Sequence, residues 1–151
     1  MDLKADTSMG YLVNHLARLF ARRLEGEIKP RGIALGAFPA LLHLWEKDGL
    51  TQKELVMRLG VEQPTMAATL SRMERDGLIY RHRDEGDARV QRIRLTQKAL
   101  ALRADALADA AQVNADALAG LSDIETKQLM GLMKRVILQL DETLPAGRAT
   151  P

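Results

Sequence analysis

The sequence predicts a mainly α-helical fold with one small β-hairpin, and three observations support this prediction. Residues 50–76 contain two short helical patterns separated by a glycine. Residues 78–95 contain two partly alternating segments on either side of a polar turn. Long amphipathic patterns of helical period precede and follow this central stretch. Two short helices across a tight turn, followed by a hairpin, form a winged helix-turn-helix.

The first helix of the central pair begins at a capping box. Thr51 and Glu54 have the S/T-x-x-E spacing, so each side chain can bond to the backbone N–H of the other residue. Gly60 stands where the chain must turn, because glycine adopts positive φ without a Cβ clash. Pro64 suits the first turn of the second helix, and Gly77 ends that helix as a left-handed cap. The apolar positions of the two helices are Leu55, Val56, Leu59, Met66, Leu70 and Met73.

The second helix carries polar and small residues on the side away from its apolar face. Gln63, Thr65, Ala68, Thr69 and Arg72 lie on this outer side. Glutamine can bond to the major-groove edge of adenine, arginine can bond to guanine, and threonine or alanine can contact the thymine methyl group. An ordinary solvated helix surface would give the same pattern. The helix alone therefore leaves both interpretations open, and the hairpin after it shifts the balance between them.

The hairpin is expected from residues 78–83 and 90–95, which flank the turn sequence DEGDAR. It contains five arginines and no lysine, namely Arg81, Arg83, Arg89, Arg92 and Arg94. A charged edge strand that prevents aggregation is the plainer interpretation. Arginine, however, suits bidentate phosphate contacts and narrow minor grooves. Asp87 stands two residues before Arg89 and can brace its guanidinium at the tip. This composition favours DNA binding.

The stretch from Leu50 to Thr96 resembles the MarR family of bacterial transcription regulators. The similar segments are LTQKELVMRLGVEQPTMAATLSRMERDGLI, the wing sequence Asp87-Ala88-Arg89, and LTQKA at 95–99. The phrase GVEQPT is closest to the SlyA-like branch. The resemblance implies that the second helix enters the major groove and that Arg89, held by Asp87, enters the minor groove. The candidate DNA-binding residues are Gln63, Pro64, Thr65, Ala68, Thr69, Arg72, Arg83, Asp87 and Arg89.

Four further helices are expected around this stretch, at about 8–29, 35–47, 97–118 and 122–140, with irregular ends at 1–7 and 144–151. Pro39 predicts a late start or a kink in the second of them, and Ala34 stands where the family often has a capping Thr or Ser. Ser122 and Glu125 form another capping box. The apolar positions expected on the first and the last two helices are Leu12, Val13, Leu16, Leu19, Phe20 and Leu24; Leu100, Leu107, Ala110, Ala111, Val113, Ala117 and Leu118; and Ile124, Leu129, Leu132, Met133, Val136, Ile137 and Leu140.

These terminal helices carry more apolar surface than a compact winged helix needs. Large exposed apolar patches are avoided, so we expect residues 8–34 and 97–143 to form a homodimer, with residues 35–96 as the DNA-binding region of a single 1–151 domain. The alternative is that the helices cover the winged-helix core within one subunit. A dimer would place two recognition helices about one DNA turn (~34 Å) apart, as an inverted repeat requires.

Composition excludes several other classes of protein. The 151 residues include no cysteine, which excludes disulfides, thiolate metal sites and thiol redox switches. No apolar signal core or membrane-length apolar run is present, so we expect a cytoplasmic protein without a membrane partner. His15, His43 and His82 are scattered, and no nucleophile elbow or phosphate loop accompanies them. We therefore expect no enzyme, no metal and no cofactor, with His43 as a hydrogen-bonded core or interface residue.

The resemblance also implies an effector, because members of the family often bind small aromatic or phenolic anions between the first, second and fifth helices and the winged domain. His15, Arg18, His43 and Trp45 are the candidates to line such a pocket, although packing or surface roles would explain each of them separately. We thus expect a sequence-specific regulator, a repressor that binds a pseudo-palindromic double-stranded DNA operator as a homodimer and is released by a ligand. A winged-helix protein-interaction module without sequence-specific DNA binding is the alternative.

Overall fold

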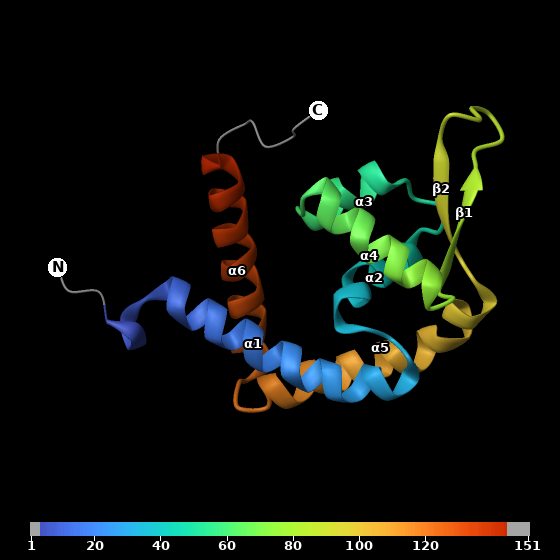
Figure 1. Ribbon diagram of the computed structural model, residues 1–151. Helices are drawn as coiled ribbons and strands as arrows, with labels where there is room; N and C mark the ends of the chain where they lie inside the picture. The colour runs from blue at the N-terminus through green and yellow to red at the C-terminus, as the bar shows by residue number, and fades with distance from the viewer. Residues whose placement is uncertain (1–3, 145–151) are drawn as a thin grey trace. The chain divides into compact units, whose positions relative to one another are not determined.

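The structure, a computed structural model, describes residues 4–144. It divides into two compact units, Met1–Val113 and Asn114–Pro151, with the boundary inside helix α5. Figure 1 shows mostly helices with a single two-stranded hairpin. The predicted mainly α-helical winged helix-turn-helix is therefore confirmed. The α-helices and strands are α1 (Met9–Ile28), α2 (Phe38–Glu46), α3 (Gln52–Leu59), α4 (Gln63–Arg75), β1 (Ile79–Arg83), β2 (Gln91–Leu95), α5 (Gln97–Leu118) and α6 (Asp123–Thr143).

Three short 3-10 helices lie at predicted helix ends or beside them, and α6 continues to Thr143, beyond the end predicted at about 140. Ala5–Thr7 form one of them where an irregular N-terminus was expected, while residues 1–3 and most of the expected tail lie outside the described residues. Lys29–Arg31 follow α1, and Gly32 then takes φ 84°. Leu35–Ala37 precede α2, and Pro39 lies in the first turn of α2. The late start predicted from Pro39 is therefore confirmed.

The helix-turn-helix forms as its local sequence predicts. The Thr51 hydroxyl accepts from the Glu54 amide at 3.1 Å, and the Glu54 carboxylate accepts from the Thr51 amide at 2.8 Å. This last contact holds the pKa of Glu54 below its usual value. Gly60 at φ 63° turns the chain after α3, and Gly77 at φ 73° turns it after α4. Leu55, Met66, Leu70 and Met73 are buried as predicted, and Val56 and Leu59 pack against the core.

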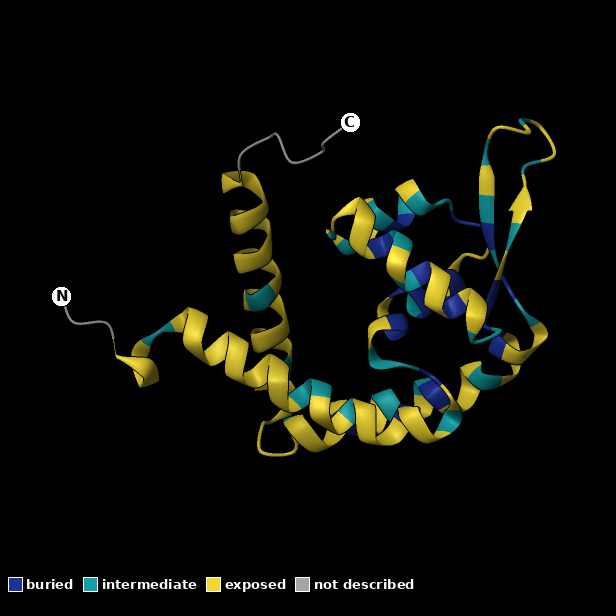
Figure 2. Ribbon diagram, viewed as in Figure 1, coloured by how far each residue is buried: buried dark blue, intermediate teal, exposed yellow. Residues whose placement is uncertain are grey.

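The buried core lies between α2, α3, α4, the base of the hairpin and the first half of α5 (Figure 2). Phe38 and Trp45 of α2 meet edge to face, with ring centroids 6.1 Å apart. The indole N–H of Trp45 donates to the carbonyl of Ala99 at 3.0 Å. A buried indole N–H needs such a partner, so this bond fixes α2 against the start of α5.

The hairpin is antiparallel, pairs Ile79 with Leu95 and Arg83 with Gln91, and is joined to the loop that precedes α3. Backbone bonds run from the Gly49 amide to the Ile93 carbonyl (3.0 Å) and from the Ile93 amide to the Leu50 carbonyl (2.8 Å). The Asp48 carboxylate accepts from the Leu95 amide at 2.9 Å. Each strand begins one residue later than predicted, at Ile79 and at Gln91. These bonds attach the wing rigidly at its base.

Helix α5 buries a narrower face than the sequence suggested. Ala99, Ala106 and Val113 are buried at intervals of seven residues, whereas the predicted face member Leu100 is 44% exposed. Arg31 secures this helix to the end of α1. Its guanidinium is paired with the Asp109 carboxylate, with one contact at 2.9 Å, and it donates to Asp105 at 3.1 Å. The contact with Arg31 lowers the pKa of Asp109.

In the single chain, the apolar residues predicted for the inner side of α6 are exposed, except for the half-buried Met133. Helix α6 starts at the predicted Ser122–Glu125 capping box, but none of its described residues is buried. Ile124 is 70% exposed and Ile137 is 54% exposed. The apolar residues of the first half of α1 are exposed as well (Figure 2). The apolar faces of α1 and α6 are therefore left uncovered in the single chain.

Candidate nucleic-acid interface

The outer side of α4 is exposed along its length. Met66, Leu70 and Met73 anchor the inner side in the core, and the helical period turns the predicted contact residues outward. Thr69 is half-buried, and the others are exposed. A cavity of about 430 Å³ lies beside this surface, against the 3-10 helix that precedes α2. It is lined by Gly36, Ala37, Pro64, Thr65, Ala68, Thr69 and Arg72.

A side-chain bond joins the starts of the two helices. Gln52 is the first residue of α3 and Gln63 is the first residue of α4. The Gln52 Nε2 group donates to Gln63 Oε1 at 3.1 Å. Gln52 is not among the predicted DNA-contact residues. Gln52 is half-buried and Gln63 is exposed.

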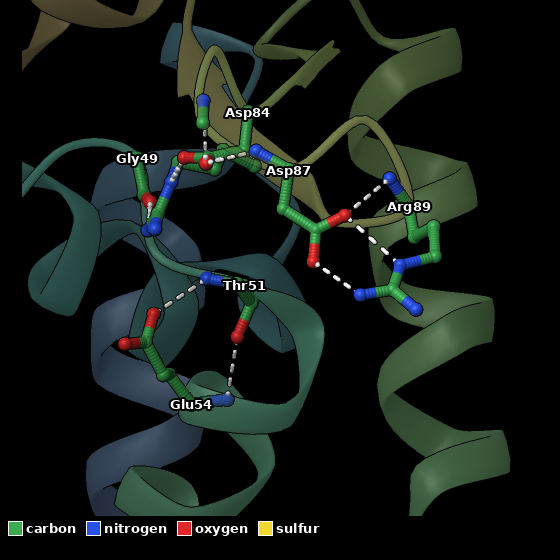
Figure 3. A network of polar contacts seen from close by, with 8 residues as sticks. Gly49, Thr51, Glu54, Asp84, Asp87 and Arg89 are labelled. Atoms are coloured by element: carbon green, nitrogen blue, oxygen red, sulfur yellow. Dashed lines mark hydrogen bonds and ion pairs between the residues drawn. The ribbon is translucent and has the colours of Figure 1, made fainter.

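The tip of the wing presents a braced arginine (Figure 3). Arg89 donates through Nε to Asp87 Oδ1 and through Nη2 to Asp87 Oδ2, both at 3.1 Å, and its side chain is 90% exposed. The backbone amide of Arg89 also donates to Asp87 Oδ1. These contacts lower the pKa of Asp87. Asp87 thus contacts the guanidinium through Nε and Nη2.

Asp84 organises the turn that carries this arginine. Its Oδ2 accepts from the amides of Gly86 and Asp87, both at 3.1 Å, and its Oδ1 accepts from Arg92 Nε at 2.5 Å. Arg92 also donates to the Gly49 carbonyl at 3.0 Å (Figure 3). The bond from Arg92 lowers the pKa of Asp84. Asp84 was not predicted as a functional residue, although aspartate two residues before glycine is typical of a turn closed by its own side chain.

The five hairpin arginines separate into two groups. Arg92 pairs with Asp84, Arg81 with Glu74 at 3.5 Å, and Arg94 with Asp48 at 3.7 Å. Arg81 and Arg94 thereby attach the wing to α4 and to the loop before α3. The Arg92–Asp84 pair lies within the wing, and Arg92 reaches that loop through the Gly49 carbonyl. Arg83, at the outer end of β1, and Arg89 are exposed. Only part of the arginine content that suggested DNA binding is therefore directed away from the protein.

The four candidate effector residues differ in environment. His15 is exposed on α1 and stacks with Tyr11, with centroids 6.3 Å apart, and Arg18 is exposed on the same helix. Trp45 is buried, and its N–H is bonded to Ala99. His43 is half-buried, but its Nδ1 is buried without a hydrogen-bond partner in the described structure. The expectation that His43 is hydrogen-bonded is therefore wrong at this nitrogen.

Within residues 4–144, no group of three or more acidic or histidine side chains is arranged to hold a metal ion. Over the same range, no helix has both the length and the apolar character needed to cross a membrane.

The sequence is similar to those of known transcriptional regulators. Residues 33–90 match the model of the MarR family. The organic hydroperoxide resistance transcriptional regulator of Bacillus subtilis is 30% identical over 105 residues, which are 70% of this chain and 71% of that protein. The transcriptional regulator TtmR of Methylorubrum extorquens is 32% identical over 98 residues. The chain spans about half (50%) of the length of TtmR.

Solved structures extend the similarity to the whole fold. The transcriptional regulator SlyA superimposes with a TM-score of 0.84 at 26% identity, over 90% of this chain and 96% of that chain. A Listeria monocytogenes protein solved in complex with a 26mer DNA gives a TM-score of 0.83 at 23% identity, over 90% of this chain and 91% of that chain. The terminal helices are therefore part of the shared architecture, together with the winged helix.

Proposed function

The chain belongs to the MarR family of DNA-binding transcriptional regulators, and from this premise we propose that it is a repressor that binds a pseudo-palindromic operator as a homodimer. The observation that carries the proposal is the exposed outer side of α4 together with an exposed arginine braced at the wing tip. One element suits the major groove and the other suits the minor groove.

The proposed contacts divide into base reading and backbone positioning. The exposed side chains of α4 present donors, acceptors and methyl groups to base edges. Arg89 enters the minor groove, with Arg83 beside the phosphates. Asp87 engages Nε and Nη2 of Arg89 and leaves Nη1 for the DNA. Bracing in this way reduces the conformational entropy that the long side chain loses on binding. The proposed DNA-contacting residues are Gln63, Pro64, Thr65, Ala68, Thr69, Arg72, Arg83, Asp87 and Arg89.

The proposed homodimer follows from the apolar residues that the single chain leaves exposed. Leu12, Val13, Leu16 and Leu19 of α1 are each 42–47% exposed, and α6 exposes a longer set. Surface of this kind marks a protein–protein interface. A two-fold dimer built from residues 8–34 and 97–143 would present two copies of α4, as a palindromic site requires.

We further propose that a small aromatic or phenolic anion releases the operator. His15, Arg18 and His43 are the polar side chains for such a ligand, and the buried Nδ1 of His43 lacks a partner. Trp45 would contribute its ring alone, because its N–H already donates to Ala99. Release requires that the ligand bind more tightly to a dimer whose α4 helices are wrongly spaced for the operator than to the DNA-binding dimer.

The class of function is tested by fluorescence anisotropy of the full-length protein with DNA fragments from upstream of its own gene, using a scrambled fragment at the same salt concentration as the control. Tight binding of one fragment at two chains per site is the expected result. Equal weak binding to every fragment contradicts autoregulation. An absence of any salt-dependent duplex binding favours instead a winged-helix protein-interaction module.

The role of the wing is tested with Arg89→Ala. We expect weaker binding to all operator sequences and a shallower dependence of log affinity on log salt, by about one unit per subunit, because one phosphate-neighbouring charge is lost. Arg135→Ala is the control, since it removes the same charge from an exposed position of α6, and sedimentation of this variant checks that two chains still associate. Salt slopes that coincide for Arg89→Ala and the parent protein would exclude the minor-groove role of Arg89.

A further inference from the structure

We propose that Gln52 determines base specificity without reading a base itself: by its hydrogen bond to Gln63 it orients that carboxamide toward one adenine in each half-site. Gln52 is thus a positioning residue for the first side chain of the recognition helix. This inference rests on the proposed operator-binding function, and it deepens that function by naming the base and the residue pair that select it.

The bond connects two fixed backbone positions. Gln52 follows Thr51, whose capping box with Glu54 holds the start of α3. Gln63 begins α4 next to Pro64, and Gly60 in the left-handed conformation sets the turn between the helices. Neither backbone needs the side-chain bond to hold its place. The 3.1 Å contact between Gln52 Nε2 and Gln63 Oε1 therefore restricts side-chain orientation and contributes little to the fold.

Hydrogen-bond chemistry explains why orientation decides which base is read. A glutamine carboxamide carries two acceptor lone pairs on Oε1 and two donors on Nε2. One lone pair of Gln63 Oε1 accepts from Gln52, which leaves the second lone pair and the Nε2 donors. Adenine offers one donor, N6–H, and one acceptor, N7, in the major groove, which suits this remaining set. A Gln63 amide turned by 180° on its own would place its NH2 group against that of Gln52, so Gln63 can turn only if the Gln52 amide turns with it.

Without Gln52, the Gln63 amide is free to turn. Turned so that only its NH2 group points into the groove, it can bond to the N7 and O6 acceptors of guanine as readily as to adenine N7. Loss of Gln52 should therefore reduce discrimination between adenine and guanine at one position. Binding at every other position should keep its base preference. A residue that only contacted a phosphate would instead weaken all sequences equally.

The experiment begins with selection of binding sites from a random double-stranded library by the full-length protein, which defines the base preference at each half-site position. Dissociation constants are then measured by anisotropy for all four base pairs at each position. The proteins compared are the parent, Gln52→Ala, Gln63→Ala, the double variant, and Lys53→Ala as the matched control. Lys53 is the exposed next residue of α3. Thermal unfolding of each variant checks that it is folded.

We expect Gln63→Ala to lose an adenine preference at one position per half-site. Gln52→Ala should lose about two- to tenfold of the same preference, as one hydrogen bond would give, and the double variant should match Gln63→Ala. Lys53→Ala should leave every preference unchanged. Gln52→Glu supplies a second variant: a carboxylate only accepts, so it turns Gln63 Nε2 toward itself and lowers the adenine preference without removing side-chain volume.

Three results would overturn the inference. Unchanged preferences in both Gln52 variants would show that Gln52 does not position Gln63. Additive losses in the double variant would show that the two glutamines act independently. A preference lost at different positions in the two single variants would lead to the same conclusion. A parent protein that selects no sequence would refute the proposed function itself, and this outcome is distinct because it is observed before any variant is compared.

Discussion

At the scale of single residues, carboxylates pair with most of the arginines of the hairpin. Asp84, Asp87, Asp48 and Glu74 each pair with an arginine of the hairpin. Asp84 closes the turn and also holds Arg92. Arg89 is the exposed exception, because its acidic partner leaves part of the guanidinium accessible. The acidic residues of the wing therefore stabilise its turn and orient its arginines, in addition to reducing its net charge.

The contribution of Asp84 should depend on pH. Its bond with Arg92 lowers its pKa in the folded state below the ordinary value of 3.8. A group with a lowered folded-state pKa stabilises the fold fully above its ordinary pKa, and this stabilisation is lost as pH falls through the lowered value. We expect Asp84→Asn to unfold at lower urea concentration than the parent near neutral pH, with the difference shrinking below pH 3.8.

Urea unfolding across a pH series measures this effect, and Glu85→Gln is the control because Glu85 is exposed on the same turn. The control should follow the parent at every pH. A difference between Asp84→Asn and the parent that stays constant below pH 3.8 would contradict the assigned role of the ion pair.

At the scale of elements, the features that the sequence predicted are those set by near neighbours along the chain. Thr51 with Glu54 and Ser122 with Glu125 lie three residues apart, and both capping boxes form. The outer side of α4 was predictable because the helical period places Met66, Leu70 and Met73 together on the opposite, buried side. Gly60 and Gly77 marked the turns for the same local reason.

The features that were missed depend on residues far apart or on small side chains. Arg31 meets Asp109 across 78 residues, and Arg92 meets Gly49 across 43. Spacing along the sequence does not indicate such contacts. Ala99 and Ala106 are buried on α5, but alanine is common on exposed and buried helix faces alike, so the larger Leu100 attracted the prediction. The Gln52–Gln63 bond depends on how the turn at Gly60 directs α4.

The turn between α3 and α4 can be tested through its backbone alone. Gly60 has φ 63°, and a Cβ added there would meet no atom within 4 Å. Gly60→Ala should therefore destabilise the protein through left-handed strain, by about 1–2 kcal/mol. Gly26→Ala is the matched control: Gly26 lies inside α1, has equally open surroundings and has no positive φ. This change should stabilise the protein by about 0.5–1 kcal/mol.

Urea unfolding of both variants gives the two free energies. Equal stability of Gly60→Ala and the parent would show that the turn can take another conformation, in which case the position of Gln63 relative to Gln52 is not fixed.

At the scale of the whole molecule, stability and assembly should be inseparable. The described part of α6 buries no residue, and α1 exposes Leu12, Val13, Leu16 and Leu19. A helix of 21 residues with this many exposed apolar side chains is poorly stabilised by its own hydrogen bonds in water. Packing against a second copy would supply the missing burial, and the same contact would fix the spacing of the two recognition helices.

The proposed dimer predicts that unfolding depends on protein concentration. The midpoint temperature should rise with concentration, and the parent should sediment as two chains at micromolar concentration, because association stabilises the folded state. Ile137→Lys should sediment largely as one chain. Ile137 is 54% exposed in the single chain, and burial of an isoleucine contributes about 1.5–3 kcal/mol. Each dimer loses two buried isoleucines, so the dissociation constant of the dimer should rise at least ~100-fold.

Met57→Lys is the control for this substitution, because Met57 is 74% exposed on α3 and lies outside the proposed dimerisation helices. It makes the same change of an exposed apolar side chain to lysine, and its sedimentation should match that of the parent. If Ile137→Lys also stayed dimeric, the dimer would not use this side of α6. A parent that sedimented as one chain at all concentrations, with a constant midpoint temperature, would exclude the homodimer. Recognition of a palindromic site would then require two chains to meet on the DNA.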